Sequence, residues 1–507
     1  MNAAQGLQPL RTLCYGEPMT IRSTRRGFLR SGAAAIPVLA FSPSARAWVS
    51  DGDACDDAIA IPGLDGEILS SPADLAAAAD DWGHIIHRTP RAVLLPASEH
   101  DIRKAVKFCR KHDIKIGPMS MVGNSHSTFG QSQAECGLVI DMSGLSTIHE
   151  INAHSVVVDA GVRWIELLQA TLPLGKSPPV LTDYIDLSIG GTLSVGGIGG
   201  QSPQHGLQVD NVEAMWVVTG EGDLRECSPS KNAALFHAVR GGLGQFAIIV
   251  RARVKLIAVP PLVRRYTAVY ADVETLIADQ VMLMNEGRFD YVEGLGLPQP
   301  DDSYVLLLEA VKYHAPGAPP NDAAMLAGLS YIPGTATPDS LSLFDFYNRL
   351  APIVDFTKFT GEWYLPHPLT DFFLPLGGAA EFIEETLANT PAEDIGYGPV
   401  LIYPFPRAKV TAPAVALPNA PICVLFSLLR WAPSADPAVV ADLVAKNRAI
   451  YEGARAIGGK RYSIGSVPMS HVDWVLHFGA KWPLFVAQKL ARDPKNTLTP
   501  GQGIFSW

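Results

Sequence analysis

GGTLSVGGIGG, from Gly190 to Gly200, and a second glycine cluster from Gly241 to Gly244 dominate the first half of the sequence. Glycine permits positive φ and lets backbone N–H groups approach an anion such as a pyrophosphate. Neither cluster contains the Gly-x-x-x-x-Gly-Lys-Ser/Thr phosphate loop, and no Gly-x-Gly-x-x-Gly lies between a strand and a helix. The pattern therefore does not support a Rossmann nicotinamide site. Taken alone, such clusters would more often be turns or packing sites.

Strand-like and helix-like segments surround these clusters without a regular order. The apolar run from Arg91 to Pro96 predicts a strand, and Ser98 followed by Asp101 predicts the start of an amphipathic helix. The segments 213–219 and 223–227 predict a hairpin. Because no βαβ rhythm is present, we expect an α+β fold and not a doubly wound sheet.

A histidine lies in a turn of small residues, within the segment GNSHSTFGQ from Gly123 to Gln131. A lone histidine in such a turn is more often a satisfied polar residue than a catalytic group. Other segments follow in a fixed order: Thr182-Asp183-Tyr184, the first glycine cluster, His205-Gly206, and GGLGQF from Gly241 to Phe246. Together they resemble the vanillyl-alcohol-oxidase (PCMH-type) superfamily of FAD-binding oxidoreductases, and within it the cytokinin dehydrogenase branch.

The resemblance implies a two-domain fold. An FAD-binding PCMH-type domain of two α+β subdomains is expected over residues 56–257, followed by an α+β substrate domain of antiparallel sheet and flanking helices over 258–458. Pro260-Pro261 marks the first boundary. The segment 459–507 ends in PGQGIF, which resembles the closing segment of the family, so it is expected to return to the FAD domain.

The resemblance also implies a covalent cofactor. His126 stands where the family bonds histidine to the 8α-methyl carbon of FAD, so an 8α-histidyl link is expected. The usual Arg-Gly-x-Gly-His-Ser turn here has Val122 and Ser125 in place of Arg and Gly. No cysteine lies in the first glycine cluster, so we expect one covalent bond and not two.

The resemblance places a further set of residues around the flavin. The expected cofactor-binding residues are Gly123, Asn124, Ser125, Ser127, Gln131, Asp183, Ser188, Ser194, Ile198, Ile249, Tyr462, Thr499 and Gln502. Each has the alternative interpretation of a loop or packing residue, above all Ser188 and Thr499, because hydroxyl side chains are common in loops.

Asp183 matches the aspartate that this branch places in front of the flavin. Hydride can leave a C–H bond only as positive charge develops on the carbon, and a carboxylate that accepts the neighbouring N–H or O–H proton relieves that charge. Asp183 is therefore the expected catalytic residue. Asp186 is the competing candidate, and a turn-capping role is the structural alternative for Asp183.

The substrate pocket is expected to include Leu369 and Glu293. Glu293 belongs to FDYVEG, from Phe289 to Gly294, which resembles cytokinin dehydrogenases. Leu369 follows His367-Pro368, where the branch usually has a tryptophan that packs on an adenine-derived substrate. Loss of that stacking leaves a purine-type cytokinin, another allylic amine or an alcohol as alternatives.

The N-terminus predicts export. Arg25-Arg26, a short apolar stretch from Gly32 to Phe41 and the site Ala45-Arg46-Ala47 indicate a twin-arginine signal over residues 1–47 that is removed, giving a periplasmic or secreted protein. The true start is Met1 or Met19. A basic tail is the structural alternative.

Composition limits the partners. A net charge of −10 argues against a basic nucleic-acid interface, and no later run approaches the ~20 apolar residues of a membrane span. No metal is expected, and the expected partners are a small-molecule substrate and oxygen or a quinone-like electron acceptor. The leading hypothesis is an FAD-dependent oxidase or dehydrogenase that oxidises a CH–NH group. The alternatives are an alcohol, sugar or alditol oxidase of this superfamily, and a non-catalytic secreted binding protein.

Overall fold

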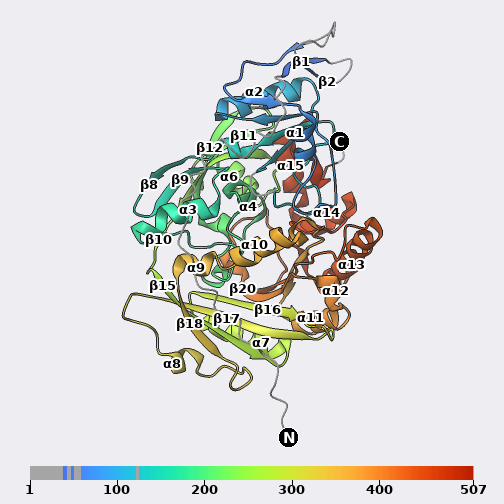
Figure 1. Ribbon diagram of the computed structural model, residues 1–507. Coiled ribbons are helices and arrows are strands. Elements are labelled where there is room, and N and C mark those ends of the chain that lie inside the picture. The colour runs from blue at the N-terminus through green and yellow to red at the C-terminus, as the bar shows by residue number, and fades with distance from the viewer. Residues whose placement is uncertain (1–37, 43–46, 51–58, 122–124, 506–507) are drawn as a thin grey trace. The chain divides into compact units, whose positions relative to one another are not determined.

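The computed structural model describes residues 38–42, 47–50, 59–121 and 125–505. Three main sheets lie along the chain, two in its first half and one in its second (Figure 1). This mixture of sheets and helices is the α+β architecture that the sequence predicts.

A four-stranded sheet comes first, in the order β4-β5-β7-β6. Its strands are β4 (Glu67–Leu69), β5 (Ala92–Leu95), β6 (Ile116–Met119) and β7 (Leu138–Asp141). The helix α2 (Glu99–Lys111) joins β5 to β6 and buries Ile102, Val106 and Cys109, which recur at helical spacing. The predicted strand and amphipathic helix are thus confirmed.

An antiparallel five-stranded sheet follows, in the order β12-β11-β13-β9-β8. Its strands are β8 (Ile148–Ile151), β9 (Ser155–Asp159), β11 (Val212–Thr219), β12 (Leu224–Cys227) and β13 (Ala247–Lys255). The pairing of β11 with β12 confirms the predicted hairpin. Four helices connect these strands: α3 (Trp164–Thr171), α4 (Ile189–Val195), α5 (Ser202–His205) and α6 (Ala233–Val239).

The first glycine cluster is not a continuous loop, because its first half forms α4. Ser188 caps this helix by accepting a hydrogen bond from Gly191 N at 3.3 Å. A Cβ on Gly190 would lie 2.8 Å from the Ala160 Cβ, so glycine here permits close packing. The cluster therefore brings α4 close to the end of β9.

The second half of the chain forms an eight-stranded antiparallel sheet, in the order β18-β15-β17-β16-β20-β21-β19-β22 (Figure 1). Its strands are β15 (Leu262–Tyr270), β16 (Tyr291–Pro298), β17 (Tyr304–His314), β18 (Thr337–Ser342), β19 (Thr370–Pro375), β20 (Val400–Pro406), β21 (Ile422–Leu428) and β22 (Lys460–Arg461). The helices α7 (Val273–Glu286), α11 (Ala379–Ala388) and α13 (Pro437–Ala456) contact it or one another.

The C-terminal segment packs against the first half of the chain. After α14 (His471–Phe478) and α15 (Trp482–Arg492), the backbone N–H of Thr499 donates to Ile116 O at 2.8 Å, and Ile116 N donates to Thr497 O at 2.8 Å. Residues more than 380 positions apart are thereby joined at the edge strand β6. Near the end of α15, the buried side chains of Lys489 and Asp493 form an ion pair 2.8 Å apart.

Most of the expected export signal lies outside the described residues, including its arginine pair. The described part includes β1 (Val38–Ser42), which pairs with β2 (Ala47–Ser50) and β3 (Ile59–Ala60). Of the expected cleavage site, Ala47 is the first residue of β2, and the other two residues lie outside the described ranges. The signal stays a prediction. Within the described ranges, none of the helices combines the length and apolar character that crossing a bilayer requires.

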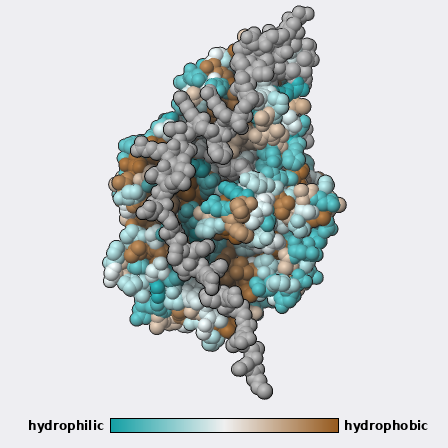
Figure 2. Space-filling model, viewed as in Figure 1, coloured by the Kyte–Doolittle hydropathy of each residue, from teal (hydrophilic) through white to brown (hydrophobic). Residues whose placement is uncertain are grey.

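Large exposed apolar side chains occur on several helices, α14 and α15 among them. The helix α10 (Ala351–Thr360) exposes Ile353, Phe356 and Phe359. On the face shown in Figure 2, hydrophobic residues form separate patches among hydrophilic ones. Scattered exposure of this kind is ordinary for a protein surface.

Candidate active site

A cavity of about 350 Å³ is lined by residues from both halves of the chain and from the C-terminal segment. This volume lies within the range of small-molecule and cofactor sites. The predicted residues that line it are Ser125, His126, Ser127, Gln131, Asp183, Ser188, Ser194, Ile198, Ile249, Leu369, Tyr462, Thr499 and Gln502. Gly123 and Asn124 lie outside the described residues.

The turn that carries His126 is anchored by a buried carboxyl group. Asp81 Oδ2 accepts hydrogen bonds from Ser127 Oγ at 2.9 Å and from Gly130 N at 2.8 Å. Burial raises the pKa of Asp81 to about 7, against the opposing effect of these hydrogen bonds. A Cβ on Gly83 would lie 2.1 Å from Thr128 O, so the two segments meet in backbone contact. Asp81 therefore fixes the path of the turn.

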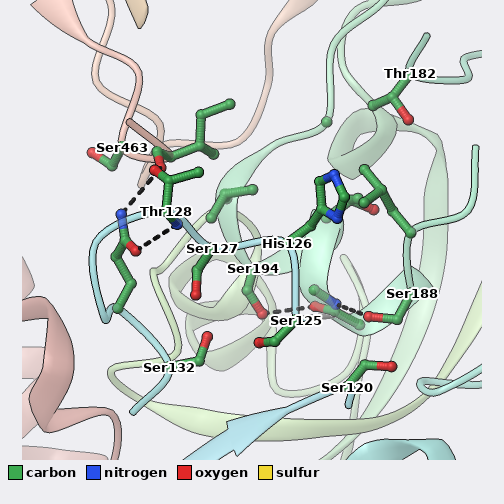
Figure 3. Close-up of a pocket in the computed structure, with 18 of the residues that line it drawn as sticks. Ser120, Ser125, His126, Ser127, Thr128, Ser132, Thr182, Ser188, Ser194 and Ser463 are labelled. Atoms are coloured by element: carbon green, nitrogen blue, oxygen red, sulfur yellow. Dashed lines mark hydrogen bonds between the residues drawn. The ribbon is translucent and has the colours of Figure 1, made fainter. Parts of the chain in front are cut away.

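The imidazole of His126 is held between two aromatic rings. Trp82 stacks on it at 4.3 Å with an interplanar angle of 11°, and Tyr184 stacks on it at 4.7 Å with 27°. Trp82 also stacks on the buried His367 at 3.9 Å. Figure 3 shows His126 pointing into the pocket. The rings restrict the orientation of the imidazole before any cofactor binds.

Short hydroxyl side chains surround the lower part of this pocket (Figure 3). Ser194 Oγ donates to Gly190 O at 2.8 Å, and Thr499 Oγ1 donates to Gly244 O at 2.9 Å. A Cβ on Gly244, whose φ is +68°, would lie 2.6 Å from Thr499 Oγ1. Together with the apolar Ile198 and Ile249, these groups fit a cofactor with a flat ring system and a polar chain.

Asp183 projects into the same cavity and is held from the substrate-domain side. Its Oδ1 accepts a hydrogen bond from Tyr291 Oη at 2.7 Å and another from Arg349 Nη2 at 2.8 Å. Its side chain keeps 20% exposure, whereas that of Glu293 behind it keeps 1%. Asp183 is thus the member of this group that can meet a bound molecule.

The guanidinium group of Arg349 lies close to three carboxyl groups. Arg349 Nη2 lies 2.8 Å from Asp183, 3.4 Å from Glu293 and 3.1 Å from Glu309. Burial raises the pKa of Glu293 well above its ordinary value, and the Asp183 carboxyl raises it further. The Tyr291 hydroxyl also hydrogen-bonds to Glu293. Tyr291 Oη accepts from Arg349 Nη2, and its single proton can be donated to either Asp183 or Glu293.

The competing candidate Asp186 has a different environment. It also lines the cavity, but its Oδ1 accepts from Arg163 Nη1 at 2.5 Å. Burial raises the pKa of Asp186, and Arg163 opposes that rise. Asp186 is thus ion-paired with Arg163, as Asp183 is with Arg349, so the two candidates differ in their partners and not in the presence of a cation.

The two predicted substrate residues are placed differently. Leu369 lines the cavity, next to an apolar wall formed by Leu401, Leu425 and Leu429. Glu293 is absent from the lining and lies behind Asp183. The sequence did not indicate Asp81, Trp82, Tyr291, Arg349 or Glu309, since each acts through a partner that is distant in sequence.

Two family models match the chain. The FAD binding domain model matches residues 90–228, and the model described as cytokinin dehydrogenase 1, FAD and cytokinin binding, matches residues 297–505. The cavity is lined by residues from both matched regions.

Related proteins cover most of the chain. An uncharacterized oxidoreductase, ORF5 of the fasciation locus in Rhodococcoides fascians, is 39% identical, with 84% of this chain and 96% of that protein aligned. Cytokinin dehydrogenase 8 of Oryza sativa subsp. indica is 34% identical over 84% of this chain and 90% of the relative. Cytokinin dehydrogenase 1 of Arabidopsis thaliana is 33% identical, with 87% and 83% aligned. The chain therefore belongs to the cytokinin dehydrogenase family of FAD-dependent oxidoreductases.

Proposed function

We propose that this protein oxidises the CH–NH group of a small amine of the cytokinin type, with FAD bonded covalently to His126. The observation that supports the proposal best is the position of Asp183, a carboxylate that lines the same cavity as His126. Tyr291 and Arg349 hold that carboxylate in place. A positioned acceptor of this kind is what removal of an amine proton needs.

In the proposed reaction, Asp183 accepts a proton, and Tyr291 and Arg349 hold its carboxylate. Asp183 Oδ1 or Oδ2 accepts the proton of the substrate N–H as the neighbouring C–H bond is broken. The flavin, when bound, supplies the hydride acceptor at N5. Tyr291 and Arg349 hold the carboxylate by two hydrogen bonds, so that its orientation requires no reorganisation during proton transfer.

The walls of the cavity suit the apolar part of such a substrate. Leu369, Leu401, Leu425 and Leu429 present aliphatic side chains, and Tyr184 supplies an aromatic face beside His126. These side chains exclude water around the reacting carbon. An allylic or aromatic substituent on the amine matches this lining.

Two further parts of the proposal concern reoxidation and location. Oxygen or a quinone-like compound is proposed as the electron acceptor, and twin-arginine export as the route to the periplasm or the exterior. The arginine pair Arg25-Arg26 supports the export proposal.

The covalent bond is tested by denaturing the purified holoenzyme, separating it on a gel and recording flavin fluorescence. We expect fluorescence to remain with the polypeptide and to disappear from it in His126→Ala. Flavin released from the wild-type chain would disprove the covalent bond and leave the family assignment intact.

The substrate class is tested by anaerobic bleaching of the flavin with N-alkenyl adenines, simple allylic amines, alcohols and polyols. We expect the amines to bleach it. Bleaching by polyols or alcohols alone would replace the amine proposal with that of an alcohol or sugar oxidase. Absence of bleaching by every class would favour a binding protein.

A further inference from the structure

A second, much smaller cavity lies beside the first. Its volume is about 10 Å³, which is room for one species of the size of a water molecule. The side chains of Val195, Leu243, Tyr462 and Ser463 line both cavities, and residues 414–416 line only the small one. The two cavities therefore share a wall.

Two buried polar side chains line the small cavity and leave hydrogen-bonding capacity unused. Arg461, on β22, and His477, on α14, are each 4% exposed. Arg461 Nε and His477 Nδ1 have no hydrogen-bond partner among the described residues. The guanidinium makes one hydrogen bond there, from Nη2 to Gly465 O at 2.5 Å. Buried polar groups are normally paired, so a ligand in the cavity would account for this unused capacity.

Positive charge gathers around the same cavity, although the protein carries a net charge of −10. Lys460 Nζ donates to Leu476 O at 3.2 Å, and Lys481 Nζ donates to Pro413 O at 2.8 Å. In the part of the chain that the structure describes, neither lysine forms an ion pair with a carboxylate, and Arg461 forms none either. The cations of this cluster therefore lack a direct counter-charge from the protein.

The protonation states of the neighbouring groups leave this positive charge in place. Burial lowers the pKa of His477 to about 3, and three neighbouring cations contribute to that shift: Lys460, Arg461 and Lys481. His477 is therefore neutral near pH 7. Asp371 is the carboxyl group that acts on Arg461, but burial raises its own pKa to about 7. Asp371 is thus only a partial counter-ion.

We propose that the small cavity is a binding site for one small inorganic anion of the size of chloride. The guanidinium of Arg461 and the N–H of neutral His477 donate hydrogen bonds to it, and Lys460 and Lys481 add electrostatic attraction. Leaving a buried cation without a full counter-charge is costly, and an anion offsets this charge whereas a water molecule does not. The inference does not depend on the proposed amine oxidation.

The test compares chloride with gluconate, an anion too large for this cavity, at constant ionic strength. We expect the melting temperature of the holoenzyme to rise with chloride concentration and to level off as the site fills, because a ligand of the folded state stabilises it. Gluconate should give no such rise. In Arg461→Gln, which removes the charge and keeps a polar side chain, the Kd for chloride should increase by about tenfold or more.

A second variant keeps the test decisive if Arg461→Gln does not fold. Lys481→Gln changes an exposed side chain, whose charge is screened by solvent, so the Kd for chloride should increase by only about threefold. Lys495→Gln is the matched control. Lys495 is also exposed and also donates to a backbone carbonyl, Arg110 O at 3.2 Å, but it lies outside the cavity. Its Kd should equal that of the wild type.

Anomalous diffraction locates the ion directly. Crystals of the holoenzyme soaked in bromide should show an anomalous peak between Arg461 and His477. Three results would overturn the inference: a cavity that holds only water in these crystals, equal melting temperatures in chloride and gluconate, or a Kd for chloride that neither Arg461→Gln nor Lys481→Gln changes. A bromide peak without stabilisation by chloride would mean binding at crystal concentration only, which also contradicts the proposal.

Discussion

Arg349 Nη2 lies 2.8 Å from Asp183 Oδ1, although the two residues are 166 positions apart in the chain. The same nitrogen lies 2.6 Å from Tyr291 Oη. Asp183, the proposed proton acceptor, is thus held by Tyr291 and Arg349, which belong to the second half of the chain. The orientation of the Asp183 carboxylate therefore depends on how the two halves of the chain pack together.

Asp183→Asn should slow anaerobic reduction of the flavin by about 10² or more, because the amide cannot accept the substrate proton as a carboxylate does. The flavin absorption spectrum should stay unchanged. Stopped-flow absorbance with an amine substrate measures the rate. Asp186→Asn is the control, since Asp186 is a carboxylate of the same cavity that pairs with a different arginine, Arg163, and an equal loss in both variants would contradict the assignment.

Arg349→Gln should lower the free energy of unfolding by about 3–5 kcal/mol, because it leaves buried carboxyl groups without their cation. Urea unfolding of the holoenzyme measures the change. Adding Glu309→Gln to this variant should restore part of the loss, since it removes one of the carboxylates that Arg349 faces at 3.1 Å. Strict additivity of the two changes would refute the shared network.

Asp81→Asn should reduce the fraction of protein that carries covalent flavin. The change weakens the hydrogen bonds that fix the His126 turn, at a cost of roughly 1–3 kcal/mol. Gel fluorescence per mole of protein gives the fraction, and the melting temperature gives the stability. The more exposed neighbour Asp80, changed to Asn, is the control. Full flavin loading in Asp81→Asn would show that the turn needs no such anchor.

Stability should fall as the pH drops from about 6.5 to 3. Burial lowers the pKa of His477 to about 3, and it does the same to His367. In the unfolded chain these histidines bind protons near pH 6.5. The contribution of the two neutral, buried histidines to the free energy of unfolding is therefore complete above that pH and is lost as the pH falls toward 3. Urea unfolding at several pH values measures how the free energy of unfolding depends on pH. In His477→Gln this dependence should be shallower than in the wild type by up to about 1.4 kcal/mol per pH unit. Parallel slopes for variant and wild type would contradict the prediction.

Local periodicity explains why parts of the fold were predictable. The strand β5, the helix α2 and the β11-β12 hairpin each follow from the side-chain pattern of one short segment. The helix α4 was missed as an element because glycine is a poor helix former, and packing of Gly190 against Ala160 outweighs that preference.

The sequence by itself determined the family, the positions of His126 and Asp183, and the α+β class, because motifs and periodicity are properties of neighbouring residues. Only the tertiary structure decided what surrounds them. Trp82 at His126, Arg349 at Asp183 and the unpaired ring nitrogen of His477 all depend on burial and on partners from other strands and helices. Hydrogen bonds, ring stacking and desolvation act through distances in space, and those distances are set when the sheets pack together.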